Sequence, residues 1–227
     1  MKAISHILVF SALALALNAC SNLERSRDLS NPKVSGSTLA QQACASCHGG
    51  LVGRENGNSI NPTYPNLAGQ QAVYLETELQ EFHDHSRTDA GAKDMMWGLA
   101  EKLTPAQMKE LAEFYAQQKP LPNPNVSNPA KVEVGKKIFA EGDPATGVPA
   151  CASCHGQHAE GNGPIPRLAG QHADYIFKQL QVFASDAGRE THSEALERPH
   201  GTPMDSISHG LSKAQRHQVA EYLQSLH

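Results

Sequence analysis

The chain has 227 residues, a net charge of −4 and 12 histidines. Hydrophobic residues make up 39% and aromatic residues 5% of it, so two domains of about a hundred residues each would have thin apolar cores. A bulky apolar group bound inside each domain would make up for that shortage. The sequence contains no run of basic residues, and we therefore expect no nucleic acid among its partners.

The chain begins with the pattern of an export signal. Lys2 gives it a positive start, and residues 7–17 form an apolar stretch that is too short to span a bilayer as a helix. Residues 17–20 read Leu-Asn-Ala-Cys, which resembles the lipobox of bacterial lipoproteins. We therefore expect a signal peptide over residues 1–19 and a lipid on Cys20, which would then begin the mature protein. The alternative is a plain signal peptide that is cut nearby.

The rest of the chain is a polar segment followed by a duplication. Residues 20–34 are polar and without periodicity, which predicts a flexible tether after the lipidated cysteine. Residues 44–49 then match residues 151–156 letter for letter, and residues 65–70 differ from residues 166–171 at one position. A repeat of about one hundred residues is too long for a solenoid unit and indicates two copies of one domain.

We expect the first domain over residues 35–118 and the second over residues 131–227. The connecting residues 119–130 are rich in proline, which favours an extended and rather stiff linker. Apolar residues recur at helical spacing in both copies, and strand-like alternation is absent. The fold class predicted is all-α, with two tandem domains.

The last helix of each copy has a recognisable start. Thr104 is followed three residues later by Gln107, and Ser212 in the same way by Gln215, which is the pattern of a capping box. Pro105 occupies the first helical position, where its missing N–H group has no cost.

The duplicated motif Cys-x-x-Cys-His is the attachment signature of c-type haem. Its two thiols add to the haem vinyl groups, and one helical turn between them spans the distance. The histidine that follows binds the iron. The predicted haem-binding residues are Cys44, Cys47 and His48 in the first copy, and Cys151, Cys154 and His155 in the second.

Other uses of these four cysteines fit less well. A thioredoxin-like redox pair needs a βαβ context, and a zinc site would need both copies to share one metal. A disulfide within Cys-x-x-Cys is strained and would leave His48 and His155 without a role. If the four cysteines bind haem and Cys20 binds lipid, the exported chain keeps no free thiol.

The repeat also indicates the sixth ligand of each iron. Met96 stands seven residues before Leu103, and Met204 stands seven residues before its counterpart Leu211. We predict Met96 and Met204 as axial ligands, which raise the reduction potential relative to a second histidine. The remaining histidines lack partners between the copies and are expected to be solvated; they are His83, His85, His172, His192, His200 and His209.

Three further residues bear on these sites. Pro65 and Pro166 each stand in a matched segment, where their carbonyl groups would hold the iron-binding imidazoles. The alternative is that these prolines only shape a turn. Trp97 follows Met96 directly, and the sequence leaves open whether it packs on the haem or binds a propionate.

Together these motifs resemble the cytochrome c4 family, dihaem proteins built from two class I cytochrome c domains. The resemblance covers nearly all of the chain after the tether. It implies His–Met coordination of both irons, relatively high potentials and a periplasmic role. It also implies that electrons come from a quinol-oxidising complex or a dehydrogenase and go to a terminal oxidase. The chain departs from the family in the lipid at Cys20 and in a longer loop before Met204, which is either an insertion or a docking surface.

The sequence leaves two alternatives to a free electron carrier. One is the electron-transfer subunit of a larger dehydrogenase or oxidase, and the other is a dihaem peroxidase. A dihaem peroxidase would need one iron that opens to peroxide beside an acid–base residue. Both copies instead offer a methionine in the same register, and no matched acidic residue accompanies it. We therefore expect an electron carrier and no enzyme.

Overall fold

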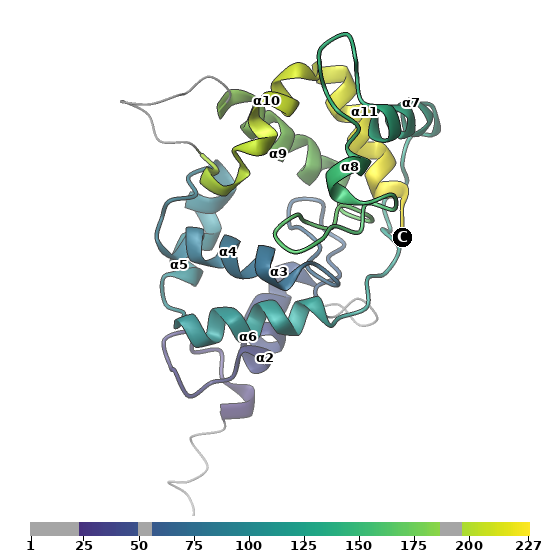
Figure 1. Ribbon diagram of the computed structural model, residues 1–227. Coiled ribbons are helices and arrows are strands. Elements are labelled where there is room, and N and C mark those ends of the chain that lie inside the picture. The colour runs from purple at the N-terminus through teal and green to yellow at the C-terminus, as the bar shows by residue number, and fades with distance from the viewer. Residues whose placement is uncertain (1–22, 50–55, 187–196) are drawn as a thin grey trace, which may run out of the picture.

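The structure is a computed structural model, and it describes residues 23–49, 56–186 and 197–227. In Figure 1 two helical domains lie one above the other, the first in purple to teal and the second in green to yellow. The described residues form helices and two isolated β-bridges, without a strand. The predicted all-α architecture is confirmed.

Each domain begins and ends with a helix, and further helical elements lie between these two. The first domain contains α2 (Gly36–Leu39), η2 (Ala40–Cys44), α3 (Ala45–His48), α4 (Ala72–His83), η3 (Ala92–Met96), α5 (Trp97–Ala100) and α6 (Pro105–Ala116), preceded by η1 (Leu23–Arg25). The second contains α7 (Pro129–Glu141), α8 (Ala152–His155), α9 (Ala173–Asp186), η4 (Pro199–Gly201), α10 (Pro203–Gly210) and α11 (Lys213–Ser225).

Both predicted capping boxes are present. The Thr104 hydroxyl accepts the backbone N–H of Gln107, whose side chain accepts the backbone N–H of Thr104. Ser212 and Gln215 make the same pair of bonds at the start of α11. The last helix of each domain therefore begins at the residue that the sequence predicts.

Two glycines allow the first and last helices of each domain to cross closely. A Cβ atom on Gly36 of α2 would lie 2.5 Å from Cβ of Glu110 on α6. On Gly135 of α7 it would lie 2.0 Å from the carbonyl oxygen of Gln218 on α11. No real Cβ atom tolerates such contacts, so these crossings require glycine. Met108 of α6 is buried in the first-domain core.

The segment before α2 differs from the predicted flexible tether. Val34 is 1% exposed and belongs to the first-domain core. The side-chain amide of Gln107 donates to the carbonyl oxygens of Asn31 and Val34 at 3.0 and 2.9 Å. The end of the segment is therefore part of the domain, because a buried apolar side chain and a buried amide hold it there.

The linker is bound to both domains. In the first domain, Asn58 accepts the Leu121 backbone N–H at 2.8 Å. In the second, the side chains of Asn123 and Asn125 lie 3.0 and 3.1 Å from Nδ1 of His172. His172 is completely buried, so the expectation that it is solvated was wrong. The linker asparagines cover it.

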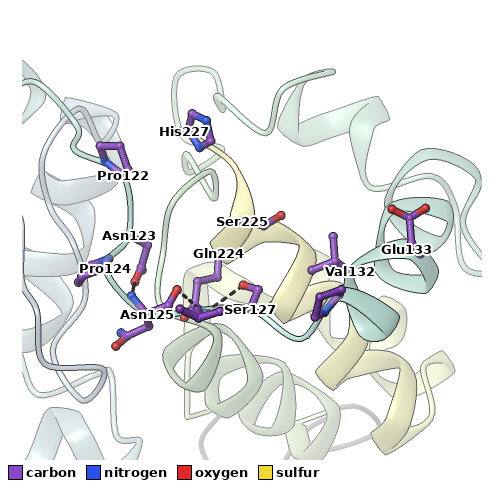
Figure 2. A pocket seen from close by; sticks show the side chains of 12 residues that line it. Pro122, Asn123, Pro124, Asn125, Ser127, Val132, Glu133, Gln224, Ser225 and His227 are labelled. Carbon is purple, nitrogen blue, oxygen red and sulfur yellow. Dashed lines mark hydrogen bonds between the residues drawn. The ribbon is translucent and has the colours of Figure 1, made fainter.

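The linker also meets the end of the chain, as Figure 2 shows. Gln224 of α11 donates to the carbonyl oxygen of Asn125 and to the hydroxyl of Ser127. Beside these bonds lies a shallow hollow of about 500 Å³. Its lining contains none of the predicted cysteine, histidine and methionine ligands. The helix α7 begins at Pro129, inside the predicted linker.

A buried group of four charged residues and one glutamine joins the domains; we call Glu78, Arg87, Asp89, Gln179 and Arg198 the interface cluster. The Glu78 carboxylate binds Arg87 of its own domain and Arg198 of the other. Arg87 also donates to Asp89 at 2.6 Å, and Gln179 accepts from Arg198 at 2.8 Å. All five side chains are largely buried, so the two carboxylates and the two guanidinium groups depend on one another for charge compensation.

The end of the longer loop supplies the second domain's share of this contact. Arg198 binds Glu78, and the His200 ring and backbone N–H bind Glu81. The Thr88 N–H donates to the Glu197 carbonyl at 2.8 Å. This end of the loop is therefore docked on the first domain of the same chain. The loop residues His192 and Glu194 lie outside the described residues.

Acid is expected to open the interface cluster. Burial raises the pKa of Glu78, but the guanidinium groups of Arg198 and Arg87 outweigh it and hold that pKa below its ordinary value. A carboxyl group whose pKa is lowered by folding contributes stability above its unfolded pKa, and that stability is lost as the pH falls through the folded-state pKa. We expect the domains to separate only once the pH falls below the ordinary pKa of a glutamate side chain, measured as an increase in the radius of gyration by small-angle X-ray scattering.

The matching substitution is Glu78→Gln, which keeps the shape and removes the charge. It removes the carboxylate that Arg87 and Arg198 share and leaves Arg87 with Asp89 alone. The loss is expected to weaken the interface by about 3–5 kcal/mol, so the larger radius appears already at neutral pH. Glu113→Gln is the control, because Glu113 is exposed and pairs with Lys109 on the same helix, away from the interface cluster. Identical scattering from both variants would contradict the role of Glu78.

Candidate haem-attachment sites

Each Cys-x-x-Cys-His motif forms one short helical turn. In the first domain Cys44 ends η2 and α3 carries Cys47 and His48; in the second, Cys151 caps α8, which ends at His155. The turn brings both thiols and the imidazole to one place in each domain. Gly49 and Gly156 end the turns with φ of 124° and 84°. This left-handed backbone is accessible to glycine at little cost and lets the chain leave the helix directly after the histidine.

A proline carbonyl orients each histidine. Nδ1 of His48 lies 3.0 Å from the carbonyl oxygen of Pro65, and Nδ1 of His155 lies 3.0 Å from that of Pro166. A carbonyl oxygen only accepts hydrogen bonds, so each Nδ1 carries the proton. Burial lowers the pKa of both imidazoles, which are therefore neutral, with a lone pair on Nε2. Both prolines thus do more than shape a turn.

The thiols do not have the properties of a redox pair. Cys44, Cys47, Cys151 and Cys154 form no disulfide. Burial raises the pKa of Cys44 and of Cys151 to about 11, whereas catalytic thiols have lowered values. Within the described part of the chain, no group of three His, Cys, Asp or Glu residues is placed to hold a metal ion. The thioredoxin-like and zinc readings therefore find no support.

Both predicted methionines are partly buried against their domain cores. Met204 lies in the first turn of α10 and packs against the same core cluster as Cys151. Met96 ends η3 and packs against Phe82, Ala92 and Ala100, whereas Cys44 packs against a separate cluster. The second domain thus joins its thiol and its methionine through one core, and the first domain does not.

The neighbours of Met96 have other partners. Met95 is 38% exposed. The indole N–H of Trp97 donates to the carbonyl oxygen of Arg87 at 2.8 Å, and its ring stacks on His85 at 4.3 Å. The Trp97 N–H is therefore used on a backbone carbonyl of its own domain. His83 bonds to the exposed Asp84.

The donor set of each domain fits a covalently attached haem. Each domain offers two thiols outside any disulfide and one neutral imidazole whose Nε2 carries a lone pair. Each also has a partly buried thioether on a different element. Soft sulfur and imidazole donors suit iron in a haem, and they lack the carboxylates and carbonyls that hard cations prefer.

The cytochrome c family model matches residues 34–119 and 132–227. The chain is 34% identical to cytochrome c4 of Azotobacter vinelandii over 191 residues, which is 81% of this chain and 84% of that protein. The solved cytochrome c4 structure from Acidithiobacillus ferrooxidans superposes with a TM-score of 0.70 at 37% identity, covering 81% of this chain and 98% of that one. The chain belongs to the cytochrome c4 family. It is a dihaem electron-transfer cytochrome with two covalently bound haem c groups, and it is not an enzyme.

A further relative has a more specific name. The chain is 34% identical over 186 residues to a thiosulfate dehydrogenase electron acceptor of Thiomonas intermedia, covering 80% of this chain and 77% of that protein. This chain is therefore similar both to cytochrome c4 proteins and to this electron acceptor. In the described ranges, no helix is long and apolar enough to cross a membrane.

Proposed function

We propose that this protein carries electrons in the bacterial periplasm, from a quinol-oxidising complex or a dehydrogenase towards a terminal oxidase. The observation that carries the proposal is the duplicated site, in which a neutral buried histidine is held by a proline carbonyl. Family membership supports the same role. The reduction potential of each iron would be set by the groups that the chain places around it.

The proposed ligands follow from the motif and from the register of the repeat. The residues assigned to covalent haem attachment are Cys44, Cys47, Cys151 and Cys154, and those assigned to the irons are His48, Met96, His155 and Met204. Each bound haem supplies an iron that gains or loses one electron. The chain holds the imidazole in one tautomer and keeps both axial side chains partly or fully buried. Little then has to move when the charge changes.

The methionine assignment can be tested by spectroscopy on the oxidised holoprotein. Met96→Leu and Met204→Leu should each remove half of the weak far-red absorption band that arises from Met–iron ligation, and both changes together should remove it all. Met95→Leu is a matched control, because Met95 is the exposed neighbour of Met96 and should leave the band intact. A full band in either single ligand variant would contradict the assignment of that methionine.

We also propose that the protein is anchored by a lipid on Cys20. The lipobox-like residues 17–20 support this, and they lie outside the described residues. Mass spectrometry of the mature protein should find an N-terminal peptide that begins at Cys20 and carries acyl chains. An unmodified N-terminus at another residue would show instead a soluble periplasmic carrier.

The second candidate is an electron acceptor dedicated to one dehydrogenase. It is favoured by the relative from Thiomonas intermedia whose name states that role. Stopped-flow reduction of the oxidised protein should distinguish the two. A respiratory carrier is expected to be reduced by membranes supplied with quinol. Rapid reduction by a thiosulfate dehydrogenase with thiosulfate, together with inert quinol-fed membranes, would favour the dedicated acceptor.

A further inference from the structure

Two matched glutamines bind the backbone of the opposite domain in a reciprocal way. Gln171 of the second domain accepts the Asn66 N–H at 2.8 Å and donates to the Asn66 carbonyl at 3.0 Å. Gln70 of the first domain accepts the Arg167 N–H at 2.7 Å and donates to the Arg167 carbonyl at 2.9 Å. The two sets of bonds are equivalent because residues 65–70 and 166–171 are copies of one segment.

The orientation of both amides follows from their neighbours. Oε1 of Gln70 accepts a second hydrogen bond, from the Gln71 N–H at 2.9 Å, and Oε1 of Gln171 accepts one from the His172 N–H at 3.0 Å. Two backbone donors therefore converge on each oxygen, while each nitrogen faces a carbonyl. A flipped amide would bring donors against donors. Both glutamine side chains are buried at 6% exposure, so water does not replace these bonds.

The bound peptides are the ones that hold the iron-binding histidines. The Asn66 N–H and the Pro65 carbonyl belong to one peptide group, and that carbonyl accepts Nδ1–H of His48. One hydrogen-bonded chain thus runs from His48 through this peptide to Gln171 in the other domain.

The second domain repeats the arrangement. The peptide group between Pro166 and Arg167 joins His155 to Gln70 of the first domain. The glutamine that acts on each histidine therefore always comes from the opposite domain.

We propose that Gln171 and Gln70 are positioning residues that lower the reduction potential of the haem in the opposite domain. The proposal rests on the assignment of His48 and His155 as iron ligands. A peptide whose N–H donates a hydrogen bond has a more negative carbonyl oxygen, because bonds in a chain polarise one another. The carbonyl then pulls harder on Nδ1–H, which makes the imidazole a more basic ligand and stabilises the oxidised iron.

This arrangement links haem potential to domain contact. Each bond from glutamine to peptide crosses the interface, so a separation of the domains would remove both at once. The potential of each haem then depends on whether the other domain is in place, without any movement of the haem ligands themselves. A structural role alone would predict no such crossed dependence.

The test uses Gln171→Met and Gln70→Met, which keep the length of the side chain and remove its hydrogen bonds, including both that cross to the opposite domain. Gln71→Met is the matched control. Gln71 also bonds across the interface, to the Glu160 carbonyl at 3.0 Å. The peptide group that contains this carbonyl bonds to the backbone of His155, through the Gly161 N–H at 2.8 Å, and not to an imidazole ring. The holoprotein would be titrated with reductant and followed by NMR, with the haem methyl signals assigned to each domain.

Gln171→Met should shift the reduction equilibrium constant of the first-domain haem about two- to threefold in favour of the reduced form. At 59 mV per decade for one electron, this is roughly 20–30 mV, upwards. The second-domain haem should not shift. Gln70→Met should shift the second-domain haem by the same amount and in the same direction, and leave the first-domain haem unchanged. Gln71→Met should shift neither haem. The Nδ1–H resonance of His48 should move in Gln171→Met, and that of His155 in Gln70→Met.

Three results would overturn the proposal: no shift in either folded variant, a shift confined to the haem of the substituted domain, or an equal shift in Gln71→Met. If one variant does not take up both haems, the proposal is tested by the other variant, through the shift in potential of the haem in the opposite domain. Failure of the proposed ligation is distinguishable, because it would appear in the unsubstituted protein as a missing Nδ1–H resonance or a missing Met–iron band.

Discussion

The hydrogen bond between a buried imidazole and a proline carbonyl is the constraint on which both sites depend. It leaves Nε2 of His48 and of His155 with a lone pair and fixes the plane of each ring. Burial keeps both rings neutral, so no proton has to leave before iron binds. Because Pro65 and Pro166 stand in segments that also form the domain contact, the same few residues shape the sites and join the domains.

The domain contact is polar and buried, so its hydrogen bonds and ion pairs form in one relative orientation of the two domains. Glu78 is shared by guanidinium groups from both domains, and its counterpart in the second copy is Gln179. The two copies therefore differ in charge at this position, with a carboxylate in the first and a neutral amide in the second. A glutamate in place of Gln179 would put a second buried carboxylate in the same cluster as Glu78. Each arginine lies over a phenylalanine ring, at 4.6 and 4.8 Å, which covers the apolar part of the cluster.

Features that depend on neighbouring residues could be predicted from the sequence, and contacts between distant residues could not. The α-helical class and the capping box at Thr104 follow from local patterns, and the structure contains both. The haem motifs are local patterns too, and each forms a short helical turn. Burial of His172 depends on the linker folding over it, and burial of Val34 depends on Gln107. No spacing within the sequence indicates that Arg198 reaches Glu78, because they lie in different domains.

A reductive titration of the purified holoprotein, with haem quantified per chain, is the most direct measurement of whether the duplicated motifs make this chain a two-electron carrier. We expect two haems per chain and uptake of two electrons, with no consumption of peroxide by either redox state. One haem per chain would contradict two equivalent sites, and a haem that reacts with peroxide would contradict the closed coordination of an electron carrier.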